Sequence, residues 1–66
     1  MRSRKTHVIE TIKRISHQYG IDIDALRGEA SRIDKGMGRV YYPLEFFSSQ
    51  EIRLAADELE EQEESL

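Results

Sequence analysis

The stretch IKRISHQYGIDIDALR, residues 12–27, decides the fold of this 66-residue chain. Ile12 faces inward from a first helix, and Gly20 offers the left-handed backbone conformation that commonly ends a helix. Ile21 is placed to fill the angle between two helices, and Leu26 to hold the second helix against the first. The small Ser16 stands where close helix–helix contact needs a small side chain. The stretch therefore predicts two helices joined by a tight turn.

The helix before the turn is expected to begin near Thr6, a residue suited to an N-cap. Glu10 and Arg14 have the spacing of a favourable ion pair on its surface. At 100° per residue, four apolar residues fall on one stripe and predict the face that packs inward: Val8, Ile12, Ile15 and Tyr19.

The helix after the turn is expected to begin at Asp22 or Asp24, because either carboxylate can cap it. Ile23, Leu26, Ala30 and Ile33 repeat at helical spacing. Gly28 inside this helix costs about 1 kcal/mol relative to alanine. It could also permit another backbone to approach closely.

Residues 39–47 are β-branched and aromatic, which favours extended structure. Pro43 cannot donate a ladder hydrogen bond, so any strand ends before it or lies at a sheet edge. Four of the five aromatic residues lie between positions 41 and 47. In so small a chain they either fill the core or form an adhesive surface.

A last helix has a clear beginning, because Ser48 stands three residues before Glu51, as in a capping box. Ile52, Ala56 and Leu59 form an inward stripe with Ala55 beside it, and docking is expected to end near residue 60. Leu54 is predicted to point away from the stripe and could mark a homodimer contact. The sequence thus predicts a mainly α fold with a short β element. It divides into a basic N-terminal arm (1–5), a three-helix domain (6–60) and an acidic frayed tail (61–66).

Composition narrows the class of protein. A chain of this length buries only about 60% of its unfolded surface, so its stability should be marginal. Cysteine is absent, which excludes disulfides and thiolate metal sites. No apolar run approaches the roughly 18 residues of a membrane span. Glu10 and Lys13 interrupt the apolar stretch that an export signal would need. A cytoplasmic protein is expected.

Candidates for catalysis are few. His7 and His17 are separated by ten residues, or about 15 Å along a helix, so they cannot share a metal ion within one chain. Residues 36–38 lack the Gly-Lys-Ser/Thr of a phosphate loop. The paired carboxylates lie in the Glu-rich end, where the fixed geometry of acid–base catalysis is not expected. We expect no enzyme, no metal and no cofactor.

Residues 12–27 follow the pattern of a helix-turn-helix, and Gly38-Arg39-Val40-Tyr41-Tyr42 follows them. Together with the helix that begins near Gln50, these residues resemble the MerR-like and phage excisionase-like winged-helix domains over roughly residues 8–59. The resemblance implies that the second helix enters the major groove of double-stranded DNA and that a wing, here shortened, contacts phosphate. It places Arg27 after the family's leucine, and Arg39 and Tyr41 in the wing. The candidate DNA-binding residues are Arg2, Arg4, Lys5, Arg27, Arg32, Lys35 and Arg39.

Charge leaves a second function open. Residues 1–33 carry seven Lys/Arg against four Asp/Glu, whereas residues 34–66 carry three against nine. A net charge of −3 opposes DNA binding unless the cations share one face. The alternative is a protein-binding adaptor or inhibitor whose acidic C-terminal helix attracts a basic partner or mimics nucleic acid. Its candidate partner-binding residues are Tyr41, Tyr42, Phe46, Phe47 and Leu54.

Overall fold

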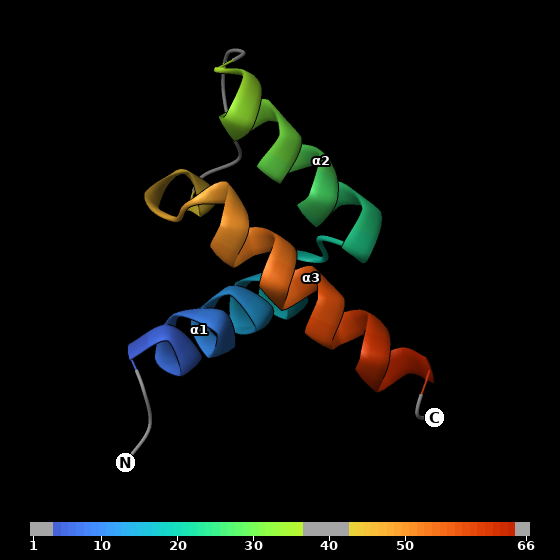
Figure 1. The fold of residues 1–66 in the computed structure, drawn as a ribbon. Coiled ribbons are helices and arrows are strands. Elements are labelled where there is room, and N and C mark those ends of the chain that lie inside the picture. Colours follow the sequence, from blue (N-terminus) through green and yellow to red (C-terminus); the bar gives the residue numbers. More distant parts are fainter. Residues whose placement is uncertain (1–3, 37–42, 65–66) are drawn as a thin grey trace.

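Three α-helices and one short 3₁₀ helix make up the computed structural model, which describes residues 4–36 and 43–64 (Figure 1). The helices are α1 (Arg4–Tyr19), α2 (Ile23–Lys35) and α3 (Ser49–Glu64), and the 3₁₀ helix is η1 (Leu44–Phe46). The predicted three-helix, mainly α fold is confirmed. Helix α1 begins two residues earlier than the sequence suggested, so residues 4 and 5 belong to it rather than to an arm.

Helix α3 lies across both other helices, and the principal helix–helix contacts are α2 with α3 and α1 with α3 (Figure 1). The core between them is built from aliphatic side chains. Fully burying a side chain such as leucine or isoleucine contributes about 1.5–3 kcal/mol, so these few residues supply most of the apolar stabilisation. The buried residues are Ile9, Ile12, Leu26, Ala30, Leu44, Ile52, Ala55 and Ala56.

The buried face of α1 differs from the predicted stripe. Ile9, Ile12 and Ser16 are buried, whereas Tyr19 is 49% exposed. The partly buried Val8 and Ile15 flank that face. The inward surface of α1 is therefore rotated by a fraction of a turn from the expected one. It consists of residues 9, 12 and 16 instead of residues 8, 12, 15 and 19.

The turn between α1 and α2 forms as predicted, but the expected packing of α2 against α1 through Leu26 is replaced by the packing of both helices on α3. Gly20 adopts the left-handed conformation, with φ at 66°. The amide of Ile21 donates to the carbonyl of Ser16 over 2.9 Å, and the Ser16 hydroxyl donates in return to the carbonyl of Ile21. The exchange gives the buried Ser16 hydroxyl an acceptor. It also gives the Ser16 carbonyl, in the last turn of α1, a donor from the turn. The turn is therefore closed from both sides.

Helix α2 begins and ends at clear caps. The Asp22 carboxylate accepts a hydrogen bond from the amide of Ala25 over 2.8 Å, so Asp22 is the cap residue of the two candidates. Leu26 and Ala30 face the core, and Gly36 ends the helix in the left-handed conformation. The predicted inward residues of α2 are confirmed.

No other backbone of the described residues lies close to Gly28, so the close approach that the sequence left open is not present. A Cβ atom placed there would meet no atom of the described residues within 4 Å. Gly28→Ala is therefore expected to raise the free energy of unfolding by about 1 kcal/mol, because alanine has the higher helix propensity. Urea denaturation followed by circular dichroism would measure the gain. A loss of stability would show that the glycine has a packing role.

The predicted short β element is wrong for the described part of residues 39–47. Residues 44–46 form η1, and no residue in 4–36 or 43–64 is a strand. Leu44 is fully buried and Phe47 packs against the core. A single 3₁₀ turn places these two side chains inward, a result that the alternation of a strand could not give. Residues 39–42 lie outside the described residues.

Helix α3 begins at the predicted capping box. The amide of Glu51 donates to the Ser48 hydroxyl over 3.2 Å, and the amide of Ser48 donates to the Glu51 carboxylate over 3.0 Å. Its inward residues are confirmed as well, but Leu54 was expected to point away and instead packs against the core. The helix continues to Glu64, so residues 61–64, which were expected to fray, are helical.

Candidate functional site

The second half of α3 carries the most concentrated charge in the chain. Residues 57–64 hold six carboxylates and no Lys or Arg. Their positions are fixed by the docking of Ile52, Ala55 and Ala56 into the core. We use the name acidic face of α3 for the six carboxylates of residues 57–64, which are Asp57, Glu58, Glu60, Glu61, Glu63 and Glu64.

Two carboxylates of this face hold Arg27, the residue expected to lead DNA binding. The guanidinium lies 2.8 Å from the Asp57 carboxylate and 2.6 Å from that of Glu60. The hydrogen bonds to Asp57 and then to Glu60 raise the pKa of Arg27 above its ordinary value. Arg27 therefore links α2 to α3 by two ion pairs, and the two carboxylates lie beside it on the surface of the protein.

A third carboxylate of the acidic face reaches α1. The Lys13 ammonium donates to the Glu58 carboxylate over 2.9 Å and lies 3.4 Å from Glu10. The hydrogen bond to Glu58 is the main cause of the raised pKa of Lys13. Glu10 thus pairs with Lys13 rather than with Arg14, and the charge of Lys13 is compensated within the chain.

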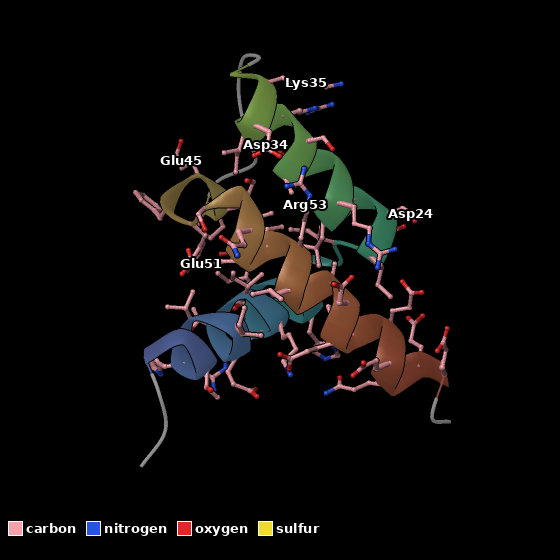
Figure 2. The ribbon with its side chains drawn as sticks, in the orientation of Figure 1. Asp24, Asp34, Lys35, Glu45, Glu51 and Arg53 are labelled. Atoms are coloured by element: carbon pink, nitrogen blue, oxygen red, sulfur yellow. The ribbon has the colours of Figure 1, made fainter. Side chains whose placement is uncertain are left out.

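The other predicted DNA-binding residues are brought together only in part. Arg32 and Lys35 are exposed on the last turns of α2, where Figure 2 labels Lys35. Arg32 lies 3.6 Å from Glu29. Arg2 and Arg39 lie outside the described residues, as do the side chains of Arg4 and Lys5.

The predicted partner-binding residues do not form one patch in the described part of the chain. Phe46 is 69% exposed, but Phe47 and Leu54 pack against the core. Tyr41 and Tyr42 lie outside the described residues. Phe46 is thus the one aromatic residue of the predicted set whose exposure the structure establishes.

At the other end of α2, Asp34 fixes the beginning of α3. The Ser49 hydroxyl donates to the Asp34 carboxylate, and Arg53 lies 2.5 Å from it (Figure 2). The hydrogen bond from Ser49, followed by that from Arg53, lowers the pKa of Asp34 below its ordinary value of 3.8. The ionised carboxylate therefore favours the folded state.

This lowered pKa predicts a dependence of stability on pH. A depressed folded-state pKa stabilises the fold above the ordinary value, and the contribution is lost as pH falls through the lowered one. We expect Asp34→Asn to be less stable than the unsubstituted chain at neutral pH, and the difference to shrink below about pH 4. Urea denaturation across a pH series measures it. A difference that does not change with pH would contradict the assignment.

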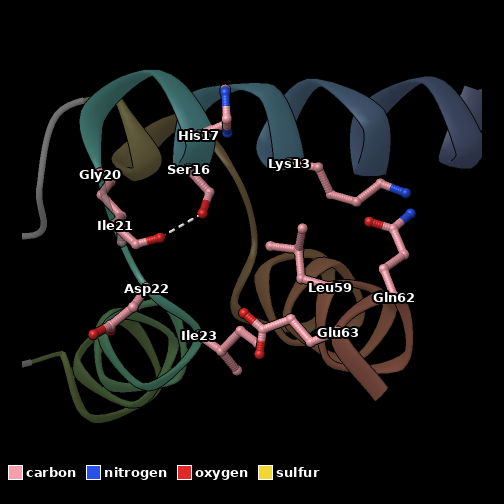
Figure 3. Close-up of a pocket in the computed structure, with 10 residues that line it drawn as sticks. All are labelled: Lys13, Ser16, His17, Gly20, Ile21, Asp22, Ile23, Leu59, Gln62 and Glu63. Atoms are coloured by element: carbon pink, nitrogen blue, oxygen red, sulfur yellow. Dashed lines mark hydrogen bonds between the residues drawn. The ribbon is translucent and has the colours of Figure 1, made fainter. Parts of the chain in front are cut away.

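A groove lies between the turn, the end of α1 and the last turns of α3, with a volume of about 580 Å³ (Figure 3). Its lining includes the partly buried side chains of Ile21, Ile23 and Leu59. Asp22 and Glu63 stand at its edge and are exposed. Sequence reasoning missed this groove, although a leucine followed four residues later by a glutamate on α3 was a signal for an apolar surface with an acidic edge.

The described residues contain neither a metal-binding cluster nor a membrane-spanning helix. No group of three or more His, Cys, Asp or Glu among them is arranged to hold a metal ion. None of the helices in residues 4–36 and 43–64 is long and apolar enough to cross a bilayer. Comparison of the chain with models of protein families, with curated proteins and with solved structures gave no match.

Proposed function

We propose that this chain is a non-catalytic protein-binding module that presents the acidic face of α3 to a basic partner. The observation that carries the proposal is the pairing of Arg27 with Asp57 and Glu60. It places two carboxylates beside the helix that would have to approach DNA phosphates. It also engages the cation on which that approach would depend.

Electrostatics favours a basic partner over nucleic acid. Phosphate neutralisation by Lys and Arg supplies most non-specific DNA affinity, whereas residues 57–64 present only negative charge. A field of one sign steers an oppositely charged partner and repels a like-charged one. Three of the six carboxylates, Asp57, Glu58 and Glu60, are held in place by ion pairs with Lys13 and Arg27. The surface is consequently ordered before a partner arrives.

Selection from a displayed library of random peptides on the immobilised chain tests this function. Enriched peptides are expected to combine Lys or Arg with aliphatic residues, and their binding should weaken as salt rises. The double variant Asp57→Asn, Glu60→Gln removes two negative charges with side chains of nearly the same size and leaves the Arg27 cation uncompensated, so it should recover fewer of these peptides. Enrichment of acidic peptides, or of none, would contradict the proposal.

Double-stranded DNA is the second candidate, because the break at Gly20 gives the arrangement that a helix-turn-helix requires. Arg32 and Lys35 on the exposed end of α2 would then contact phosphate. Titration of a labelled duplex at two salt concentrations, with Arg27→Ala and Arg32→Ala, separates the two candidates. Absence of binding in dilute salt removes the DNA candidate, whereas binding that Arg27→Ala weakens contradicts the protein-binding one.

A further inference from the structure

The groove beside the turn has the chemistry of a specific docking site. We infer that it receives an aliphatic side chain from a partner helix that carries Lys or Arg next to that side chain. This inference rests on the proposed function and names both the site and the chemical class of the partner. Three properties of the groove support it: a preformed apolar floor, a negative edge and a suitable size.

The floor is formed by Ile21, Ile23 and Leu59, which come from the turn, from α2 and from α3 (Figure 3). Each of the three is partly buried and packs against the core. Their positions are therefore fixed by the fold and are not created by a ligand. Apolar side chains that are held in place but remain open to solvent on one side are typical of ligand-binding clefts.

The edge of the groove is negative. Glu63 is exposed there, and the Lys13 ammonium is already compensated by Glu58 and Glu10. Asp22 also lines the groove, but its carboxylate caps α2 by accepting a hydrogen bond from the amide of Ala25. The groove also lies beside the C-terminal ends of α1 and α3, whose backbone carbonyls add partial negative charge. The partial positive charge at the N-terminal end of α2, which also lines the groove, is met by the capping carboxylate of Asp22. A cation on the partner is consequently favoured at this edge, and a phosphate or a carboxylate is not.

The same charge argues against a second copy of this chain as the occupant. Two copies would bring their acidic faces together at the groove, each with six carboxylates in residues 57–64. The volume of about 580 Å³ lies within the range of roughly 300–1,000 Å³ found for small binding clefts. It suits the leucines that one face of a helix presents at successive turns.

The test uses a short helical peptide with a leucine stripe flanked by arginine, titrated into the full chain with isotope-labelled methyl groups. The methyl resonances of Ile21, Ile23 and Leu59 are expected to shift first. Glu63→Lys should lower the affinity for the peptide by about fivefold, since the substitution reverses a charge at the edge of the groove. Glu64→Lys makes the same change one residue further along α3, outside the groove lining, and should leave the affinity nearly unchanged.

Two further peptides complete the experiment. Replacement of the arginines by glutamate, or of the leucines by alanine, should abolish the methyl shifts. If the first peptide leaves these methyl groups unshifted, or if the two lysine variants weaken it equally, the groove is not the site. Binding that shifts resonances elsewhere on the acidic face overturns the groove and leaves the proposed function standing. Failure of the proposed function itself is recognised separately, by a library selection that enriches no basic peptide.

Discussion

Replacing Leu26 with alanine is expected to lower the free energy of unfolding by about 3 kcal/mol. Leu26 is fully buried at the centre of the core, so the substitution removes apolar contacts and leaves a cavity. A domain of this size has a total stability of about 3–10 kcal/mol. The variant should therefore retain only about 0–7 kcal/mol and unfold at a clearly lower temperature than the unsubstituted chain. Urea denaturation followed by circular dichroism at low temperature would give the loss.

Leu54→Ala is the matched control for this substitution. It removes the same atoms from a leucine that is only partly buried against the core. Because its environment is open on one side, the expected loss is about 1 kcal/mol. Equal losses at the two positions would mean that the core is not centred on Leu26.

Gly20→Val is expected to have the next largest effect, a loss of about 2 kcal/mol. With φ at 66°, Gly20 adopts a conformation that costs an L-residue roughly 1–2 kcal/mol, and a β-branched side chain more. Among residues 4–36 and 43–64, nothing lies within 4 Å of a Cβ atom at this position, so the loss comes from the backbone and not from a steric clash. Thermal unfolding followed by circular dichroism would detect it as a lowered Tm.

Gly20→Asn provides the control for the backbone effect. Asparagine tolerates the left-handed conformation better than other residues with a Cβ atom, so its loss should be clearly smaller. If valine and asparagine prove equally tolerated, the turn does not depend on a left-handed residue. The two-helix arrangement around it would then need another explanation.

Local chemistry explains why the turn and the caps could be predicted from the sequence. Each of these features depends only on residues a few positions away in the sequence. All three are present: the left-handed Gly20, the cap at Asp22 and the capping box of Ser48 and Glu51. The inward residues of α2 and α3 were also foreseeable. Each of these helices has one main apolar face, and that face is buried, although Leu54 of α3 lies off the predicted stripe and also packs against the core.

Helix α1 shows where such prediction stops. Val8 and Ile9 are adjacent and apolar, and Ile15 adjoins the small Ser16, so two neighbouring faces could be buried. The choice between them is made by the direction in which α3 crosses, which no local pattern contains. Ser16 is nearly fully buried only because its hydroxyl finds the carbonyl of Ile21.

The candidate site was foreseeable only in composition. The sequence displays the acidic end, but Arg27 meets Asp57 across 30 positions and Lys13 meets Glu58 across 45. Pairs at such separations follow from the packing of helices and not from spacing along one helix. From the sequence, Arg27 was therefore predicted to contact a phosphate, whereas in the fold its guanidinium pairs with the carboxylates of Asp57 and Glu60.

The place of α3 between the other two helices has a consequence during synthesis. Since α1 and α2 each make their main contacts with α3, the first half of a nascent polypeptide has no partner for its apolar side chains. Those side chains remain accessible to chaperones until residues 49–64 have left the ribosome. Acquisition of the native state should accordingly be abrupt once α3 has emerged, with no stable intermediate built from α1 and α2 alone.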